Sequence, residues 1–176
     1  MRISTLTLWV FAMCLPVLSH AQTCGTANLL ADTPNSRFIL NTDGTLLDKN
    51  TGLTWKRCLE GQNWTGITCS GSASSYTWQG ALNIAENTTF ANQSDWRLPN
   101  LKELLSIVEL ACNLPAINLT VFPKFPATVN KVWSSTPVTE QIGTSVGSSW
   151  LIDFEQGAAN NDYRDVRHLM RVVRGK

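Results

Sequence analysis

The chain has 176 residues, 15% of them charged and 43% hydrophobic, and a formal net charge of +1. This near-neutral balance argues against nucleic acid as the partner, because binding to phosphates needs a basic surface. After the N-terminal leader no apolar run is long enough to cross a membrane, and the remaining length suits one domain with its own core.

The first residues have the pattern of a secretory signal peptide. A short basic start precedes an apolar run over residues 6–18, and Ser19-His20-Ala21 forms a small–x–small cleavage site. We therefore expect residues 1–21 to be removed and residues 22–176 to form a single exported domain, in the periplasm, at the cell surface or in the medium. The alternative, a buried N-terminal helix, is disfavoured by Pro16.

The cysteines fit an exported protein. Once the leader has gone, Cys24, Cys58, Cys69 and Cys112 remain, an even number in an oxidising compartment. Of the possible pairings we favour Cys58–Cys69 with Cys24–Cys112, because the first closes a short Gly- and Asn-rich loop. A zinc site is the alternative, but close cysteine pairs are missing and His168 is the sole histidine after the leader.

The first half of the domain is expected to contain short strands and a long loop. Residues 38–48 are predicted to form a β-hairpin, because Asp43-Gly44 supplies the residue types of a tight turn. A second turn at 49–52 leads into a strand at 53–55. Residues 59–76 are rich in Gly, Ser, Thr and Asn and are predicted to be a loop held by the Cys58–Cys69 bond.

Two helices follow. One is expected where apolar residues recur with helical spacing, at Trp78, Ala81, Leu82 and Ala85. Asn100 and Glu103 have the spacing of a capping box at the start of the second. The buried stripe of this second helix is predicted to be Leu101, Leu104, Leu105 and Val108. Its outward-facing residues are predicted to be Lys102, Glu103, Ser106 and Glu109.

The last third is predicted to be β-structure with long connections. A strand is expected at 132–135, a Gly/Ser/Thr-rich loop at 139–148, and a second strand in which one face is apolar through Trp150, Ile152 and Phe154. A turn is expected at Asn160-Asn161-Asp162, after which residues 166–174 close the chain. The fold class is therefore α+β, with two helices and a mostly antiparallel sheet.

The stretch Asp95-Trp96-Arg97-Leu98-Pro99-Asn100, followed by Glu103-Leu104, resembles the C-terminal domain of the Legionella collagen-like adhesin. Further matching stretches are Asp43-Gly44-Thr45, Thr51-Gly52-Leu53-Thr54-Trp55, Tyr76-Thr77-Trp78-Gln79, Ala81-Leu82, Pro115-Ala116-Ile117-Asn118, Phe122-Pro123, Trp133-Ser134-Ser135 and Arg171-Val172-Val173-Arg174. The resemblance covers nearly the whole chain after the leader.

This resemblance implies a C-type-lectin-like fold, with a twisted, mostly antiparallel sheet, two helices and long surface loops. It also implies an exported protein without established enzymatic activity, since the best-understood members are adhesins that engage sulfated glycosaminoglycans. The present chain lacks the collagen-like repeat that precedes the domain in that family. The trimerisation and avidity that such a repeat supplies therefore do not follow from the resemblance.

The basic C-terminus is the candidate ligand-binding segment. The last 13 residues hold five basic residues against one acidic residue, a net charge of about +4. The candidate residues are Arg164, Arg167, His168, Arg171, Arg174 and Lys176, because arginine forks bind sulfate or carboxylate in bidentate fashion. In the alternative interpretation some of them are solvated strand residues, and Arg171 or Arg174 pairs with Asp153 or Glu155.

Tryptophans offer faces on which sugar rings can stack, but most of them are predicted to be core residues. Those at apolar-face positions are Trp55, Trp78, Trp96, Trp133 and Trp150. Trp64, in the loop that the Cys58–Cys69 bond closes, is the one expected to be exposed.

We expect no cofactor and no catalytic residue, because His168 lies in a basic segment without a nucleophile-elbow pattern. A calcium site at Asn160, Asn161 and Asp162 is the alternative, although a turn explains these residues equally well. The expected function is a secreted or surface-exposed, non-enzymatic binding module, an adhesin for anionic glycans or for an extracellular protein. The alternative is a structural or assembly component of the cell envelope.

Overall fold

The computed structural model describes residues 22–25, 30–139 and 147–175, and it confirms the predicted α+β class. The predicted leader and Lys176 lie outside the described residues, as does most of the loop expected at 139–148. Within them, every pair of adjacent strands is antiparallel, and there are two α-helices. No helix among these residues is both long and apolar enough to span a bilayer.

The elements are short and are linked by long connections. In the first half they are β1 (Thr23–Cys24), a 3-10 turn (Asn35–Arg37), β2 (Phe38–Leu40), β3 (Thr45–Asp48), β4 (Thr54–Lys56), β5 (Asn63–Trp64), β6 (Cys69–Ser70) and α1 (Trp78–Glu86). The second half contains α2 (Leu101–Leu105), β7 (Cys112–Asn113), β8 (Lys131–Pro137), β9 (Ser148–Asp153), β10 (Ala158–Tyr163) and β11 (Val173–Arg174).

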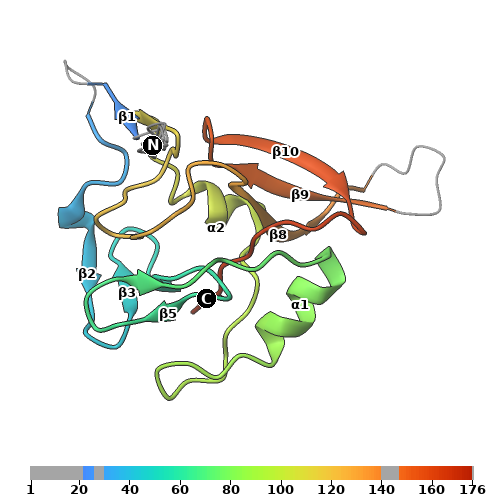
Figure 1. Ribbon diagram of the computed structural model, residues 1–176, viewed down its shortest axis with the longest axis horizontal. Helices are drawn as coiled ribbons and strands as arrows, with labels where there is room; N and C mark the ends of the chain where they lie inside the picture. The colour runs from blue at the N-terminus through green and yellow to red at the C-terminus, as the bar shows by residue number, and fades with distance from the viewer. Residues whose placement is uncertain (1–21, 26–29, 140–146, 176) are drawn as a thin grey trace, which may run out of the picture.

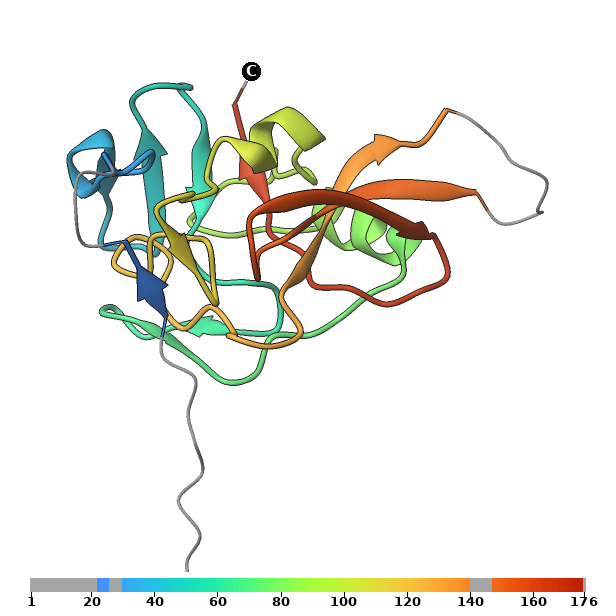
Figure 2. The ribbon, with the colours of Figure 1, turned by 90° about the horizontal axis from the view of Figure 1, so that it is seen from above.

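Two sheets organise the domain. Strands β10, β9 and β8 form one in that order, and β11, β4, β3 and β2 form the other. The first sheet lies on one side of the molecule and β2 and β3 lie on the other in both ribbon views (Figures 1 and 2). Two smaller pairs, β1 with β7 and β5 with β6, lie outside these sheets.

The sheet of β8, β9 and β10 is buried on both faces near its centre. Ile152 of β9 belongs to the core cluster that includes Leu104 of α2, whereas its neighbour Leu151 belongs to the cluster that includes Ala81 of α1. Successive strand residues point to opposite faces, so the two helices cover opposite faces of this sheet. The prediction of a single apolar face in this strand was therefore wrong, and Trp150 is only half-buried.

The predicted hairpin is confirmed, and its turn explains the choice of residues. Asp43 Oδ1 accepts hydrogen bonds from the Thr45 backbone N–H at 2.9 Å and the Thr45 hydroxyl at 2.7 Å. Gly44 has a φ of 86°, and a Cβ there would lie 2.6 Å from Cγ of Trp64. A side chain at this position is therefore excluded both by backbone strain and by the indole ring.

Helix α2 begins with the predicted capping box. Asn100 Oδ1 accepts from the Glu103 N–H at 2.9 Å, and Glu103 Oε2 accepts from the Asn100 N–H at 2.8 Å. The helix ends at Leu105, earlier than the predicted stripe, and Leu105 itself is exposed. The regular helix is therefore only five residues long, little more than one turn.

Glu109 was predicted to face solvent, and that prediction was wrong, since its exposed fraction is only 3%. Its carboxylate accepts hydrogen bonds from the backbone N–H groups of Asp32, Thr33 and Ala111, at 2.8–3.1 Å, and from the Thr33 hydroxyl at 2.8 Å. Burial raises the pKa of Glu109, but these donors together outweigh burial and lower it. The carboxylate thus fastens residues 32–33 to the segment after α2.

The predicted turn at 160–162 was also wrong. These three residues lie inside β10 and pair, in chain order, with Leu151, Trp150 and Ser149 of β9. The reversal occurs earlier, around Gly157, whose φ is 75°. Residues 166–174 are mostly irregular, and only the end of this segment is a strand, β11, which pairs with β4.

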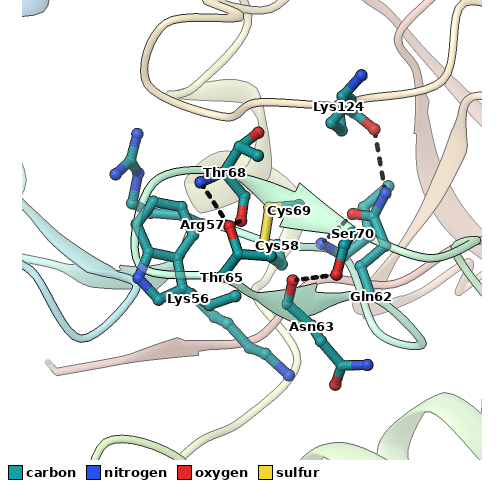
Figure 3. The surroundings of a disulfide bond; sticks show 12 residues. Lys56, Arg57, Cys58, Gln62, Asn63, Thr65, Thr68, Cys69, Ser70 and Lys124 are labelled. Carbon is teal, nitrogen blue, oxygen red and sulfur yellow. Dashed lines mark hydrogen bonds between the residues drawn. A yellow bond between two sulfur atoms is a disulfide. The ribbon is translucent and has the colours of Figure 1, made fainter.

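Both disulfides have the pairing favoured from the sequence, Cys24–Cys112 and Cys58–Cys69. The second is buried, with exposed fractions of 1% and 2%, and the loop that it closes contains the small hairpin of β5 and β6. Gln62 links this loop to the rest of the fold, because its side-chain amide donates to the Lys124 carbonyl at 3.1 Å (Figure 3).

The two disulfides are expected to differ in their resistance to reductant. Cys24 is exposed and Cys112 is half-buried, so a thiolate can reach this bond, whereas the Cys58–Cys69 bond is enclosed. Brief treatment with dithiothreitol, followed by alkylation and peptide mass mapping, should label Cys24 and Cys112 first. Labelling of Cys58 and Cys69 should require denaturant. Faster labelling of the enclosed pair in the folded protein would contradict this prediction.

Candidate functional site

The basic residues predicted to form one ligand-binding segment are not gathered in one place. Arg164, Arg167 and His168 lie beside the start of α1, Arg171 is inside the protein, and Arg174 lies on β11. Lys176 is outside the described residues.

Arg171 is buried, with an exposed fraction of 1%. Its Nη1 donates to the backbone carbonyls of Lys56 at 2.7 Å and Arg57 at 2.6 Å, and its guanidinium carbon lies 4.5 Å from the centre of the Phe122 ring. Burial lowers the pKa of Arg171 to about 9, which leaves it protonated at neutral pH. The prediction that Arg171 contacts a ligand at the surface was therefore wrong, and its partners are carbonyls and not the carboxylate of the alternative interpretation.

Arg174 is engaged in a local ion pair. Its Nε donates to Oδ1 of Asp95 at 2.7 Å, so the partner is Asp95 and not Asp153 or Glu155. Next to it, Arg97 makes two 2.7 Å hydrogen bonds with the Glu103 carboxylate and one with the Gly175 carbonyl at 3.0 Å. Asp95 and Glu103 thus neutralise the positive charges of Arg174 and Arg97.

Arg164 is held in a defined position. Its Nε donates to the Ser149 hydroxyl at 3.0 Å, and its guanidinium carbon lies 4.5 Å from the centre of the Trp78 ring. A Cβ at Gly147 would lie 3.2 Å from that carbon, so the glycine makes room for the guanidinium. The Arg164 carbonyl also accepts from the Trp78 N–H at 2.9 Å, which ties the segment to the start of α1.

Arg167 and His168 have different surroundings although they are adjacent. Arg167 is exposed, and its Nη2 donates to the Ser75 carbonyl at 2.7 Å. His168 is buried, with Nε2 2.9 Å from Oδ2 of Asp162 and its ring 4.7 Å from that of Trp133, edge to face. His168 is therefore part of the core beneath the surface that carries Arg167.

Arg164 and Arg167, which we call the arginine pair, share one feature. Neither forms a salt bridge with any residue that the structure describes. Both contact the segment 75–78. Arg167 donates to the Ser75 carbonyl, and Arg164 accepts from the Trp78 N–H and packs its guanidinium on the Trp78 ring. Among the described residues, the predicted segment therefore reduces to two guanidinium groups along one short stretch of surface.

The family model described as the Lcl C-terminal domain matches residues 44–174. The chain belongs to the Lcl C-terminal domain family. A search of curated proteins found no match. The matched range confirms the resemblance seen in the sequence, and it extends from the first hairpin turn to β11. The C-type-lectin-like relationship stays a prediction.

Membership of the Lcl C-terminal domain family and the two disulfides together indicate an exported or surface location, since such bonds persist in oxidising compartments. Among the described residues no three histidine, cysteine or acidic side chains come together in a metal-binding group. Asn160 and Asn161 are neighbours on β10, so their side chains point to opposite faces. The three residues proposed for calcium therefore do not converge.

Sequence reasoning missed a groove in this Lcl-type domain. It lies between α1 and the stretch Trp96–Asn100, has a volume of about 560 Å³, and is called the α1 groove below. Its lining includes Gln79, Leu82, Asn83, Trp96, Leu98 and Asn100. The structure confirms the predicted core position of Trp96 and the predicted helix cap at Asn100, and both residues also line this groove.

Trp64, the one tryptophan predicted to be exposed, is half-buried. Its ring lies over the guanidinium of Arg57, 4.5 Å away, and its Nε1 donates to the Thr42 carbonyl at 2.9 Å. Arg57 in turn donates to the carbonyls of Val121 and Thr120. Trp64 thus covers a structural arginine.

Proposed function

We propose that this protein is an exported, non-enzymatic binding module that recognises sulfated glycans through the arginine pair. Family membership supports a binding module at or beyond the cell surface. The observation that carries the ligand class is that Arg164 and Arg167 lie along one stretch of surface without a described carboxylate partner. Such guanidinium groups suit sulfate oxygens.

Arg164 is well suited to this role because its side chain is already ordered. The Trp78 ring and the Ser149 hydroxyl hold the guanidinium through its face and its Nε. Neither terminal nitrogen has a hydrogen-bond partner among the described residues, and together they form the fork that matches two sulfate oxygens. A side chain ordered before binding loses less entropy when the ligand arrives, which favours affinity.

His168 supports a binding role over a catalytic one. General base catalysis requires an imidazole nitrogen within reach of the substrate proton. Here the ring packs against Trp133 and is buried, with an exposed fraction of 8%, so a substrate cannot reach it, and its Nε2 pairs with Asp162. The histidine therefore orders the segment that carries the arginine pair.

Retention on a heparin column tests the proposal. The protein is expected to be retained at low salt and to elute as salt rises, because exposed charge interactions are screened. The double substitution Arg164→Ala/Arg167→Ala should lower the affinity at least about tenfold, since each arginine loses charge-assisted hydrogen bonds. The matched control is Lys49→Ala/Lys102→Ala, which removes the same charge from exposed residues elsewhere.

Equal loss of retention in both double variants would mean that net charge alone is responsible, and it would defeat the named site. Absence of retention by the unmodified protein would defeat the ligand class. Co-purification with envelope proteins in that case would favour the alternative function, an envelope component that binds protein partners.

A further inference from the structure

The α1 groove combines an apolar floor with a polar rim. Its floor is made by Leu82 and Ala85 of α1 together with Trp96 and Leu98, all of which belong to or pack against one core cluster. Its volume of about 560 Å³ lies within the range of small-molecule sites, about 300–1,000 Å³. Helix α1 lies at the periphery of the fold (Figure 1), and its groove-lining residues Gln79, Asn83 and Glu86 are exposed to solvent.

The rim offers uncharged hydrogen-bonding groups close to one another. Gln79 Nε2 donates to Asn83 Oδ1 at 3.0 Å, which leaves Gln79 Oε1 and Asn83 Nδ2 without a partner among the described residues. Asn100 uses its Oδ1 to cap α2, so its Nδ2 is likewise unpaired there. The rim thus presents amide donors and an acceptor above an apolar surface.

The charge of the groove differs from that of the arginine pair. Arg97 lines the groove, but its guanidinium is neutralised by Glu103. Glu86 also lines it, is exposed, and forms no salt bridge with a described residue. The described residues that line the groove therefore give it a neutral to slightly negative charge, which disfavours sulfated or carboxylated ligands by repulsion.

From these features we propose that the α1 groove binds an uncharged pyranose sugar, at a site separate from the arginine pair. The apolar C–H face of the ring packs on the half-buried side chain of Leu82, above the buried Trp96 and Leu98, while neighbouring hydroxyls pair with the amides of Gln79 and Asn83. Each hydroxyl both donates and accepts, which matches the mixed groups of an amide pair. The protein then recognises two features of a glycan, a sulfate at the arginine pair and a neutral sugar ring in the α1 groove.

The test uses the full exported protein and four uncharged probes, the methyl pyranosides of glucose, galactose, mannose and N-acetylglucosamine. Saturation-transfer NMR and amide spectra of the labelled protein should show binding of at least one probe. Resonances of the Gln79 and Asn83 side chains should shift. Binding should stay unchanged between about 0.1 and about 1 M NaCl, because no ion pair is involved.

The variant Gln79→Ala/Asn83→Ala should weaken that binding at least about tenfold, since two hydrogen-bonding side chains are lost. It should stay folded, because both residues are exposed on α1 and alanine favours helix. The matched control, Gln156→Ala/Asn161→Ala, removes the same amides from exposed positions on another surface and should bind normally.

The groove site would be overturned if no probe binds, if binding falls as salt rises, or if the α1 variant binds as tightly as the unmodified protein. The Arg164→Ala/Arg167→Ala protein separates this inference from the proposed function. Normal probe binding by that protein supports two independent sites, whereas loss of probe binding would place the sugar at the arginine pair and contradict the groove.

Discussion

Replacing Arg171 by alanine is expected to lower the free energy of unfolding by about 3–5 kcal/mol. The change removes two short hydrogen bonds to the carbonyls of Lys56 and Arg57 and leaves those carbonyls buried without a donor. It also empties the space beside the Phe122 ring. Urea-induced unfolding followed by circular dichroism measures the loss.

Two further variants identify the cause. Arg171→Met keeps most of the side-chain volume, so it should cost less than alanine while still leaving the carbonyls unpaired. Arg167→Ala, at the exposed neighbouring arginine, should change stability by less than about 0.5 kcal/mol. If Arg171→Ala also changed the free energy of unfolding by less than about 0.5 kcal/mol, Arg171 would not be a stabilising residue.

Acid is expected to destabilise the fold below about pH 4.5, the ordinary pKa of a glutamate. The pKa of Asp48 is raised by burial but lowered more strongly by Arg37, Thr51 and Asn50. Asp48 accepts hydrogen bonds of 2.7 and 2.5 Å from the Arg37 guanidinium. The pKa of Glu109 is also lowered, because its carboxylate accepts hydrogen bonds from four donors.

The direction follows from the lowered pKa values. A carboxylate whose pKa is lower in the folded state stabilises the protein fully above its unfolded pKa. That stabilisation is lost as the pH falls through the folded pKa. The free energy of unfolding should therefore be level near neutral pH and should decline through the acidic range. Urea denaturation at a series of pH values gives this profile.

The variant Glu109→Gln assigns part of the profile. An amide at this site turns an N–H group toward backbone donors, so the variant should be less stable at neutral pH by about 2 kcal/mol. Its profile should also be flatter in acid, because one titrating group is gone. Glu155→Gln, at an exposed residue, serves as the control. An acid profile identical to that of the unmodified protein would contradict the role of Glu109.

Features fixed by neighbours in the sequence were predicted correctly. The capping box of Asn100 and Glu103 and the turn at Asp43-Gly44 depend on residues two or three positions apart. The pairing of Cys58 with Cys69 likewise follows from the short loop between them. In each case the physical cause lies within a short stretch of the sequence.

Features fixed by distant contacts were missed. Helical spacing predicted that Glu109 faces solvent, but α2 ends at Leu105. The Glu109 carboxylate instead accepts hydrogen bonds from residues 32–33. Asn160-Asn161-Asp162 has the composition of a turn, yet β9 pairs with it and makes it a strand. Because β10 is an edge strand, polar residues are tolerated on it.

The candidate site shows the same division. The sequence placed charge in the last residues, but the burial of Arg171 depends on carbonyls that lie 114 and 115 positions earlier in the chain. The position of Arg164 depends equally on Trp78 and Ser149, from other elements. The α1 groove arises where α1 meets the Trp96–Asn100 stretch, which no local pattern could indicate.

The most direct test of the account is a titration of the purified protein with heparin and with the same polysaccharide after chemical desulfation. We expect the sulfated chain to bind, the desulfated chain to bind far more weakly, and the Arg164→Ala/Arg167→Ala protein to lose this preference. Equal affinity for the two polysaccharides, or an undiminished preference for sulfate in the double variant, would contradict recognition by the arginine pair.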